Sequence, residues 1–319
     1  MTSRRKIMIS HIALALFFCA LIGVGTFFDR EISAALYAPQ SVPVRILTSF
    51  GLYVPFAAFV FFSSVLFGQY SVQQGASARR RRTALIITGL LALITGLAGS
   101  ISLTHYECLG SFDFIARAPS AVKIPLLTVF AMLPVFLWGK AVGSRLGYDK
   151  ELIRRIIKLL IFILIVTLLM LLGKNVFARP RYRTTLGPGI DFVPWYSVSL
   201  GSGRAAAAAG VDKNAFQSFP SGHSISNVAG IFIFPAFAMV IHKLKGKEAL
   251  LFAAGVVYGL MIMLTRLILG AHFLTDVSFG ALIATVVSMI YYRIEVNTRD
   301  NDREKPAPVG SRSTENTEK

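Results

Sequence analysis

Long apolar blocks separated by short polar stretches run along the chain. Eight blocks approach the length of about 20 residues that a helix needs to cross the hydrocarbon core of a bilayer. Their approximate limits are 7–28, 48–68, 84–104, 124–143, 156–173, 224–242, 249–269 and 275–292. Three prolines fall inside the second and fourth blocks, and membrane helices tolerate proline where neighbouring helices satisfy the freed carbonyls. The pattern predicts an all-α fold, a polytopic transmembrane bundle of about eight spans.

The composition agrees with this prediction. Of the 319 residues, 54% are hydrophobic and 15% are charged, whereas a soluble domain carries about 25% charged residues. The last stretch, 297–319, is polar and charged and contains Pro306 and Pro308. Such a composition cannot bury a core, so we expect a disordered tail there.

The net charge of +17 could indicate a nucleic-acid-binding protein, but the basic residues gather in alternate loops. These residues are Arg4, Arg5, Lys6, Arg79, Arg80, Arg81, Arg82, Lys140, Arg145, Lys150, Arg154, Arg155, Lys158, Lys243, Lys245 and Lys247. If every block spans, all of these loops lie on one side, and the positive-inside rule makes that side the cytoplasm. We therefore expect both termini in the cytoplasm and no nucleic-acid partner.

This topology brings distant polar clusters to the same outer side of the membrane. With the amino terminus inside, the fifth span ends outside near Lys174 and the sixth begins outside near His223. The seventh span ends outside near Arg266, and the eighth starts outside near His272 and Asp276. The convergence of three clusters at one depth predicts a functional site.

The first cluster places four cations, Lys174, Arg179, Arg181 and Arg183, directly after an apolar span, where Pro180 is expected to end the helix. One explanation is that these long side chains reach lipid headgroups from the helix end. The other is a functional site, because ionisable residues at membrane depth usually have a function and outer-side cations oppose the insertion bias. This cluster alone leaves both explanations open.

The second cluster is the segment 218–224, Ser-Phe-Pro-Ser-Gly-His-Ser. Pro220 sets its own backbone φ, Gly222 permits close backbone approach, and Ser221 can cap the helix that follows. Amides at the start of a helix attract anions. The alternative is an ordinary helix cap with His223 beside it by chance.

The third cluster joins Arg266, His272 and Asp276. Residues four apart lie on one face of a helix, so Asp276 can hold one imidazole nitrogen of His272 protonated and leave the other to attack. The alternative is a buried pair of Arg266 and Asp276 that neutralises itself. A histidine between the two makes this alternative less favoured.

Together, the three clusters resemble the signature of the type 2 phosphatidic acid phosphatase (PAP2) superfamily. That signature is a lysine, six residues and Arg-Pro; then Pro-Ser-Gly-His; then Ser-Arg, five residues, His, three residues and Asp. The matching residues are Lys174, Arg181, Pro220, Ser221, Gly222, His223, Arg266, His272 and Asp276. Two positions depart from it: Tyr182 replaces the proline after Arg181, and Thr265 replaces the serine before Arg266.

The resemblance covers roughly residues 156–292 and divides the chain into three parts. Residues 1–150 form amino-terminal transmembrane helices without a recognised motif, residues 151–296 a PAP2-like catalytic membrane core, and residues 297–319 a disordered cytoplasmic tail. The usual number of spans in the family is nearer six than eight, so the family suggests six to eight spans.

The resemblance also implies residue roles. His272 would be the nucleophile, oriented by Asp276, and His223 would protonate the leaving group. The phosphoryl oxygens would be held by Lys174, Arg181, Arg266 and the backbone at Ser221 and Gly222. Donors aimed at the charge that develops on a phosphoryl group are the main catalytic device in such reactions. We therefore expect no metal or other cofactor, and the sequence offers neither a carboxylate cluster nor a Cys/His metal pattern around Cys19 and Cys108.

A site at the membrane interface predicts an amphiphilic substrate, a lipid phosphate within the bilayer. The candidates are phosphatidate, phosphatidylglycerol phosphate, undecaprenyl pyrophosphate and the phosphates of lipid A, and the loop 184–217 should discriminate among them. A lipid phosphotransferase or a membrane transporter are the alternatives, although a transporter has no use for the Pro-Ser-Gly-His element. We expect a bacterial inner membrane location with the site on the periplasmic face, and no obligatory protein partner.

Overall fold

The computed structural model describes residues 3–105, 108–199 and 201–304, and the chain forms helices and loops throughout these ranges, with no strand among them. Within these ranges, eight helical segments are long and apolar enough to cross a membrane, which confirms the predicted number of spans. The helices that form them are α1 (Ser3–Leu36), α2 (Val42–Ser71), α3 (Ala78–Leu103), α5 (Ser120–Leu127) with α6 (Leu133–Leu146), α7 (Lys150–Phe177), α9 (Gly222–Val228) with α10 (Gly230–Ala236), α11 (Glu248–Ile268) and α12 (Leu274–Glu304).

The boundaries of α7 follow from capping residues and proline. At its start, the side chain of Asp149 accepts hydrogen bonds from the amides of Glu151 and Leu152, which otherwise lack partners at a helix amino terminus. At its end, Ala178 adopts a left-handed conformation with φ of +43°. The helix thus stops just before Pro180, as the sequence predicts.

At the other end of the chain, α12 continues to Glu304, past residue 297, where the sequence predicts the start of a disordered tail. The remaining part of that predicted tail, 305–319, lies outside the described residues.

Six of the eight spans share one apolar core. Phe18 of α1, Phe62 of α2, Ile156 of α7, Ile225 of α9 and Val277 of α12 are all buried in the same cluster, and Met263 brings α11 into it. The packing therefore unites α1 and α2 with residues 151–296, across the boundary at residue 150 that the motifs predict. Burial of these side chains positions the helices that carry the three polar clusters.

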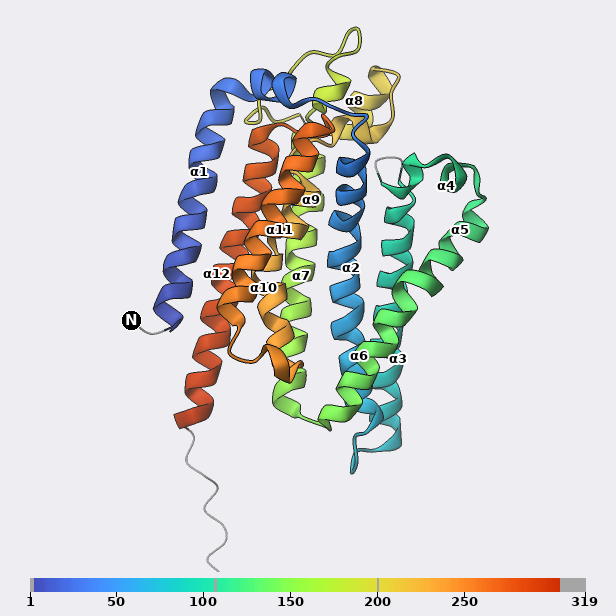
Figure 1. Ribbon diagram of the computed structural model, residues 1–319, viewed down its shortest axis with the longest axis vertical. Helices are drawn as coiled ribbons and strands as arrows, with labels where there is room; N and C mark the ends of the chain where they lie inside the picture. The colour runs from blue at the N-terminus through green and yellow to red at the C-terminus, as the bar shows by residue number, and fades with distance from the viewer. Residues whose placement is uncertain (1–2, 106–107, 200, 305–319) are drawn as a thin grey trace, which may run out of the picture.

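The remaining two spans, α3 and α5–α6, lie between α2 and α7 in the sequence and pack against the side of α2 that faces away from α7 (Figure 1). Glycines allow the backbones to approach: a Cβ at Gly143 would lie only 2.2 Å from the carbonyl oxygen of Val65, and one at Gly139 would lie 2.6 Å from that of Phe61. Close contact through small residues is typical of helix packing in membranes. The fold is a six-span unit with a two-span addition.

The loops separate into two groups at opposite ends of the bundle (Figure 1). We call one the motif end, where the α1–α2 loop, the segment 178–221 with α8 (Ser202–Ala208), and the α11–α12 loop meet. The other, the basic end, contains the α2–α3, α6–α7 and α10–α11 connections. Helix α1 is kinked at Phe28, and its last turns bend across the motif end.

Candidate active site

The structure brings the three polar clusters together at the motif end. The carbonyl of Ser218 lies 2.6 Å from Nδ1 of His272, and the amide of Ser221 donates to the carbonyl of Asp276 over 3.0 Å. The guanidinium of Arg181 reaches the carbonyl of Ala271 over 3.4 Å. Residues from the end of α7, the start of α9 and the α11–α12 loop therefore form one site.

His272 lies in the loop between α11 and α12 and is only 1% exposed. A carbonyl oxygen can only accept a hydrogen bond, so Nδ1 of the ring donates to Ser218 and carries the proton. The carboxylate of Asp276 is farther away, with Oδ2 at 3.8 Å from Nδ1. A backbone carbonyl, and not the predicted carboxylate, is thus the direct partner of the imidazole.

Asp276 instead binds two groups that lie next to His272. Its Oδ2 accepts from Oγ of Ser218 over 2.5 Å and from the amide of Phe273 over 2.8 Å. In the second bond, the side chain of the third residue of α12 accepts from the amide of the residue before the helix. This arrangement is one half of a capping box. Asp276 therefore acts on His272 through Ser218 and through the loop.

The environment keeps His272 neutral. Burial of the ring, together with the positive charges of Arg181 and Arg266, lowers the pKa of His272 to about 3, against the opposing effect of Asp276. A neutral ring with its proton on Nδ1 has a lone pair on Nε2. This is the protonation state that a nucleophilic histidine requires.

Two of the predicted phosphate-binding cations are buried near His272. Arg266 is in the last turn of α11, and Arg181 follows α7. Nε of Arg181 donates to the carbonyl of Asn214 over 2.7 Å, so the loop 184–217 fixes this side chain. Tyr182, in the place of the family's proline, is packed between the rings of Tyr37 and Phe273 at centroid distances of 5.4 and 5.8 Å. Aromatic packing thus constrains this turn.

The start of α9 lies close to the end of α7. A Cβ at Gly222 would lie 2.5 Å from Sδ of Met170 and 3.5 Å from Nζ of Lys174, so glycine is needed for this approach. Oγ of Ser221 accepts from the amide of Ser224 over 3.3 Å, which confirms the predicted helix cap. The amide of Ser221, predicted to bind phosphate, instead donates to Asp276.

His223, the predicted acid, occupies the second position of α9 and is half-buried. Its carbonyl accepts from the side-chain amide of Asn227 over 2.7 Å, and the same amide donates to the carbonyl of Gly51 in α2 over 2.8 Å. These bonds fix the first turn of α9 against α2. They therefore hold the backbone of His223 at the motif end.

The role of Arg179 was not predicted from the sequence, where this residue is one of four cations that follow an apolar span. The guanidinium is 1% exposed and lies between two carboxylates: Nη1 contacts Oδ1 of Asp276 at 2.5 Å, and Nη2 contacts Oδ2 of Asp29 at 2.9 Å. It also lies over the ring of Phe273 at 4.2 Å. The available signal was Asp29 itself, an acidic residue directly after an apolar block.

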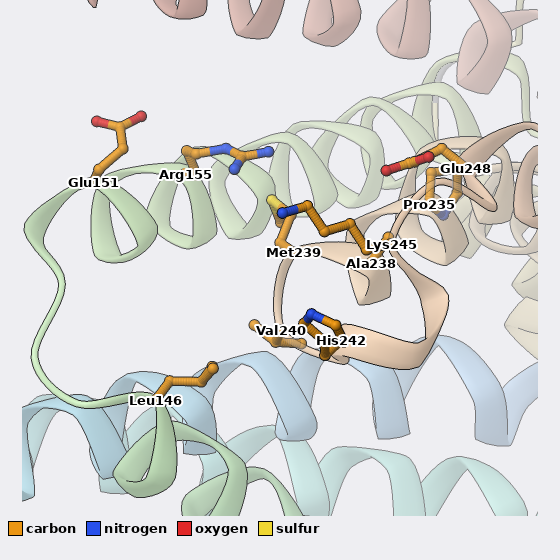
Figure 2. A pocket seen from close by; sticks show the side chains of 10 residues that line it. All are labelled: Leu146, Glu151, Arg155, Pro235, Ala238, Met239, Val240, His242, Lys245 and Glu248. Carbon is orange, nitrogen blue, oxygen red and sulfur yellow. The ribbon is translucent and has the colours of Figure 1, made fainter.

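A separate cavity of about 520 Å³ lies at the basic end, between the end of α6, the start of α7 and the α10–α11 connection (Figure 2). Its lining includes Arg155, His242, Lys245 and Glu248, and Figure 2 shows Glu151 pointing away from the other lining side chains. Arg155 also forms an ion pair with Glu295. None of these residues belongs to the three clusters.

Across the part of the chain that the structure describes, no group of three or more His, Cys, Asp or Glu side chains is arranged to hold a metal ion. Of the three cations predicted to bind phosphate, Arg181 and Arg266 lie close enough to His272 for their charges to act on it, and Lys174 lies beside Gly222.

Comparison with known proteins gives a family match. The model of the PAP2 superfamily matches residues 155–300, a range that contains all three clusters. No curated protein and no solved structure matches the chain. The match confirms the resemblance that the motifs indicate: residues 155–300 of the chain are similar to the PAP2 superfamily.

Proposed function

We propose that this protein is a membrane lipid phosphatase that works through a phosphohistidine on His272. The observation that carries the proposal is the state of this residue: a buried, neutral imidazole whose Nδ1 is fixed by Ser218, close enough to Arg181 and Arg266 for both charges to act on it. The family match supports phosphatase activity, and the eight apolar spans support a membrane location.

In the first step, the lone pair of His272 Nε2 attacks phosphorus and the bond from phosphorus to the leaving oxygen breaks. His223, entering as the protonated acid, gives its proton to the departing alkoxide or phosphate. In the second step, water attacks the phosphohistidine while His223 takes one of its protons, and inorganic phosphate leaves. Both residues return to their starting states, so atoms and protons balance.

The cations stabilise the charge that develops during these steps. In this proposal, Lys174 on α7, Arg181 in the segment after it and Arg266 on α11 act on one phosphoryl group. Buried donors that are already in place act more strongly on a developing charge than water does, because they need no reorganisation. In this proposal they supply the positive charge that Mg²⁺ supplies in many phosphoryl-transfer enzymes.

The substrate class follows from the position of the site at the end of a membrane bundle. A lipid can present its phosphate there while its tails stay in the bilayer. The segment 184–217 covers this end and is tied to α1, because Nε1 of Trp195 donates to Oγ1 of Thr26 over 3.0 Å. Trp195 also stacks on Phe219 next to Pro220. We propose that this covering loop selects the headgroup.

We propose that the basic end faces the cytoplasm and the motif end the outer side, periplasmic if the membrane is a bacterial inner membrane, because basic loops are retained in the cytoplasm. A cysteine introduced at Gly187, in a protein lacking Cys19 and Cys108, should react with an impermeant thiol reagent in intact cells. A cysteine at Gln74, in the α2–α3 connection, should stay unlabelled. The reverse labelling pattern would place the site in the cytoplasm.

The test of the function is phosphate release by the purified protein in detergent, with EDTA present. The panel is phosphatidate, phosphatidylglycerol phosphate, undecaprenyl pyrophosphate and lipid A. We expect release from at least one of these lipids at an unchanged rate in EDTA. Activity that EDTA abolishes and Mg²⁺ or Zn²⁺ restores would contradict the metal-free mechanism. Phosphate recovered on a second lipid would identify a phosphotransferase.

A further inference from the structure

We propose that Asp29, on α1 and outside the range that matches the family, is a positioning residue for the catalytic centre. Through Arg179 and the first turn of α12 it fixes Asp276, and through Asp276 it fixes the partner of His272. The inference rests on the proposed function of His272 and deepens it, since it makes the first helix a part of the catalytic unit.

The first link is between α1 and α12. Oδ1 of Asp29 accepts from the amide of Thr275 over 3.0 Å, and Oδ2 accepts from the hydroxyl of the same residue. Thr275 is the second residue of α12, and amides in the first turn of a helix have no partner within the helix. Asp29 therefore caps α12 from another helix, at a depth where its side chain is only 3% exposed.

The second link is the guanidinium of Arg179. Its two terminal nitrogens bind the two carboxylates, at 2.9 Å to Asp29 and 2.5 Å to Asp276, and Nη1 also donates to Oγ1 of Thr275 over 2.8 Å. A planar group with donors in fixed directions transmits the position of one partner to the other. Movement of Asp29 would therefore move the guanidinium that holds Asp276.

The third link reaches the imidazole. Oδ2 of Asp276 accepts from Oγ of Ser218 over 2.5 Å, and the carbonyl of the same serine accepts from Nδ1 of His272 over 2.6 Å. Asp276 thus holds the residue that sets the orientation of the ring. Small displacements of a reacting group cost rate steeply, because the attack needs a narrow range of geometries.

The shape of α1 gives independent support. The helix is kinked at Phe28, the residue before Asp29, where the backbone leaves helical geometry. One turn earlier, a Cβ at Gly25 would lie 2.8 Å from Cγ2 of Thr275 and 3.1 Å from its amide nitrogen. The glycine lets α1 touch the start of α12, and the kink places Asp29 over it. Both features act at the same contact.

The alternative is that this buried ion cluster only anchors α1. Buried pairs often contribute little net stability, and breaking one by removing a single partner is strongly destabilising. A purely anchoring cluster would therefore change the melting temperature and leave the rate per folded molecule intact. A positioning role lowers kcat in protein that is still folded.

The experiment compares Asp29→Asn with Glu31→Gln, a matched loss of one negative charge at an exposed position of the same helix. Melting temperature, kcat and KM are measured on the best lipid of the panel. We expect Asp29→Asn to lower kcat by about 10–100-fold, by analogy with the loss seen when a residue that orients a metal ligand is removed, and to change KM by less than about threefold. Glu31→Gln should match the wild type.

A double-mutant cycle with Asp276→Asn tests the route. If Asp29 acts through Asp276, adding Asp29→Asn to Asp276→Asn should cost far less than it costs alone, because coupled residues are not additive. The inference would be overturned if the loss of kcat in the double variant equalled the product of the two single losses. A wild-type kcat in folded Asp29→Asn would overturn it as well. If Asp29→Asn does not fold, Thr275→Val removes only the hydroxyl contacts and should still lower kcat without raising KM.

The outcome separates this inference from the proposed function. A wild type that hydrolyses lipid, with an equally active Asp29→Asn variant, refutes the inference alone. If no lipid of the panel is hydrolysed, the rise in melting temperature that orthovanadate causes is measured instead. Orthovanadate bound to a nucleophile has the five-coordinate geometry of the phosphoryl transition state, so Asp29→Asn, which disturbs the position of His272, should reduce that rise. A wild type that neither releases phosphate nor responds to vanadate would refute the proposed function, and the inference with it.

Discussion

The motif end and the basic end of the bundle use similar residue types in opposite ways. At the motif end Arg266 is fully buried and His272 is 1% exposed. At the basic end His242 and Lys245 are exposed, and the pair of Arg154 and Glu151 leaves both side chains about 45% exposed. The number of charged residues at one end of the bundle therefore says little about its function. Their burial and their partners decide what they can do.

The difference is electrostatic. Charges separated by water are screened by its high dielectric constant and by salt, so exposed pairs contribute little. Charges inside a bundle act on one another much more strongly. The buried arginines near His272 therefore help to keep the ring neutral, and buried carboxylates hold Arg179 in one orientation. For the basic residues of the opposite end, the positive-inside rule predicts a different role, the orientation of the chain in the membrane.

The largest effect in this comparison is expected from His272→Ala. Removing the nucleophile should lower turnover of the lipid substrate by on the order of 10⁴-fold or more, while the protein remains folded, because other groups cannot replace a covalent nucleophile. The measurement is phosphate release per folded molecule, with the melting temperature as control. Near-wild-type activity in the folded variant would show that the histidine only packs the loop.

The next effect concerns His223→Ala. Loss of the general acid should slow the departure of the leaving group by roughly 10²–10⁴-fold. The loss should be smaller for an aryl phosphate, whose leaving group needs little protonation. The ratio of rates on the two substrates is the measurement, and equal losses on both would argue against an acid role for His223.

A smaller effect, on the stability of the fold, is expected at acidic pH. The folded pKa of His272, about 3, lies below the unperturbed value of 6.5. As the pH falls below 6.5, the unfolded chain binds a proton that the folded protein does not, so the free energy of unfolding decreases by up to about 1.4 kcal/mol per pH unit. The melting temperature of His272→Asn should therefore decline less steeply than that of the wild type between pH 6.5 and pH 5. Parallel declines would contradict a buried neutral ring.

The smallest effect is expected from a substitution at the basic end. Lys245→Ala removes an exposed cation from the cavity at the basic end (Figure 2). Because it is remote from the motif clusters and surrounded by solvent, kcat and KM should stay within about twofold of the wild type and stability within about 0.5 kcal/mol. A loss comparable to that of His223→Ala would mean that the two ends are coupled.

The sequence predicts the spans and the convergence of the clusters because both depend on simple patterns. Apolar block length sets the number of crossings, and alternation of crossings puts Lys174, His223 and His272 on one side. The cap at Ser221 follows from residue type alone. These features are local, so no packing information is needed to find them.

Other parts of the site could not be predicted. The partner of His272 is a backbone carbonyl, which has no side-chain signature, and it belongs to Ser218 in another segment. Asp29 reaches Arg179 across 150 positions of sequence. The membership of α1 and α2 in the core was also hidden, because in a membrane the lipid-facing and core-facing sides of a helix are both apolar.

A phosphohistidine on His272 is a covalent intermediate that can be trapped and located in the chain. The wild type and His272→Ala are mixed with a lipid substrate labelled with ³²P, quenched without acid and digested, and the labelled peptide is identified. We expect an acid-labile phosphoryl group on the peptide that contains His272, and no label in the variant. Turnover by the wild type with label on another residue, or equal labelling of folded His272→Ala, would contradict it.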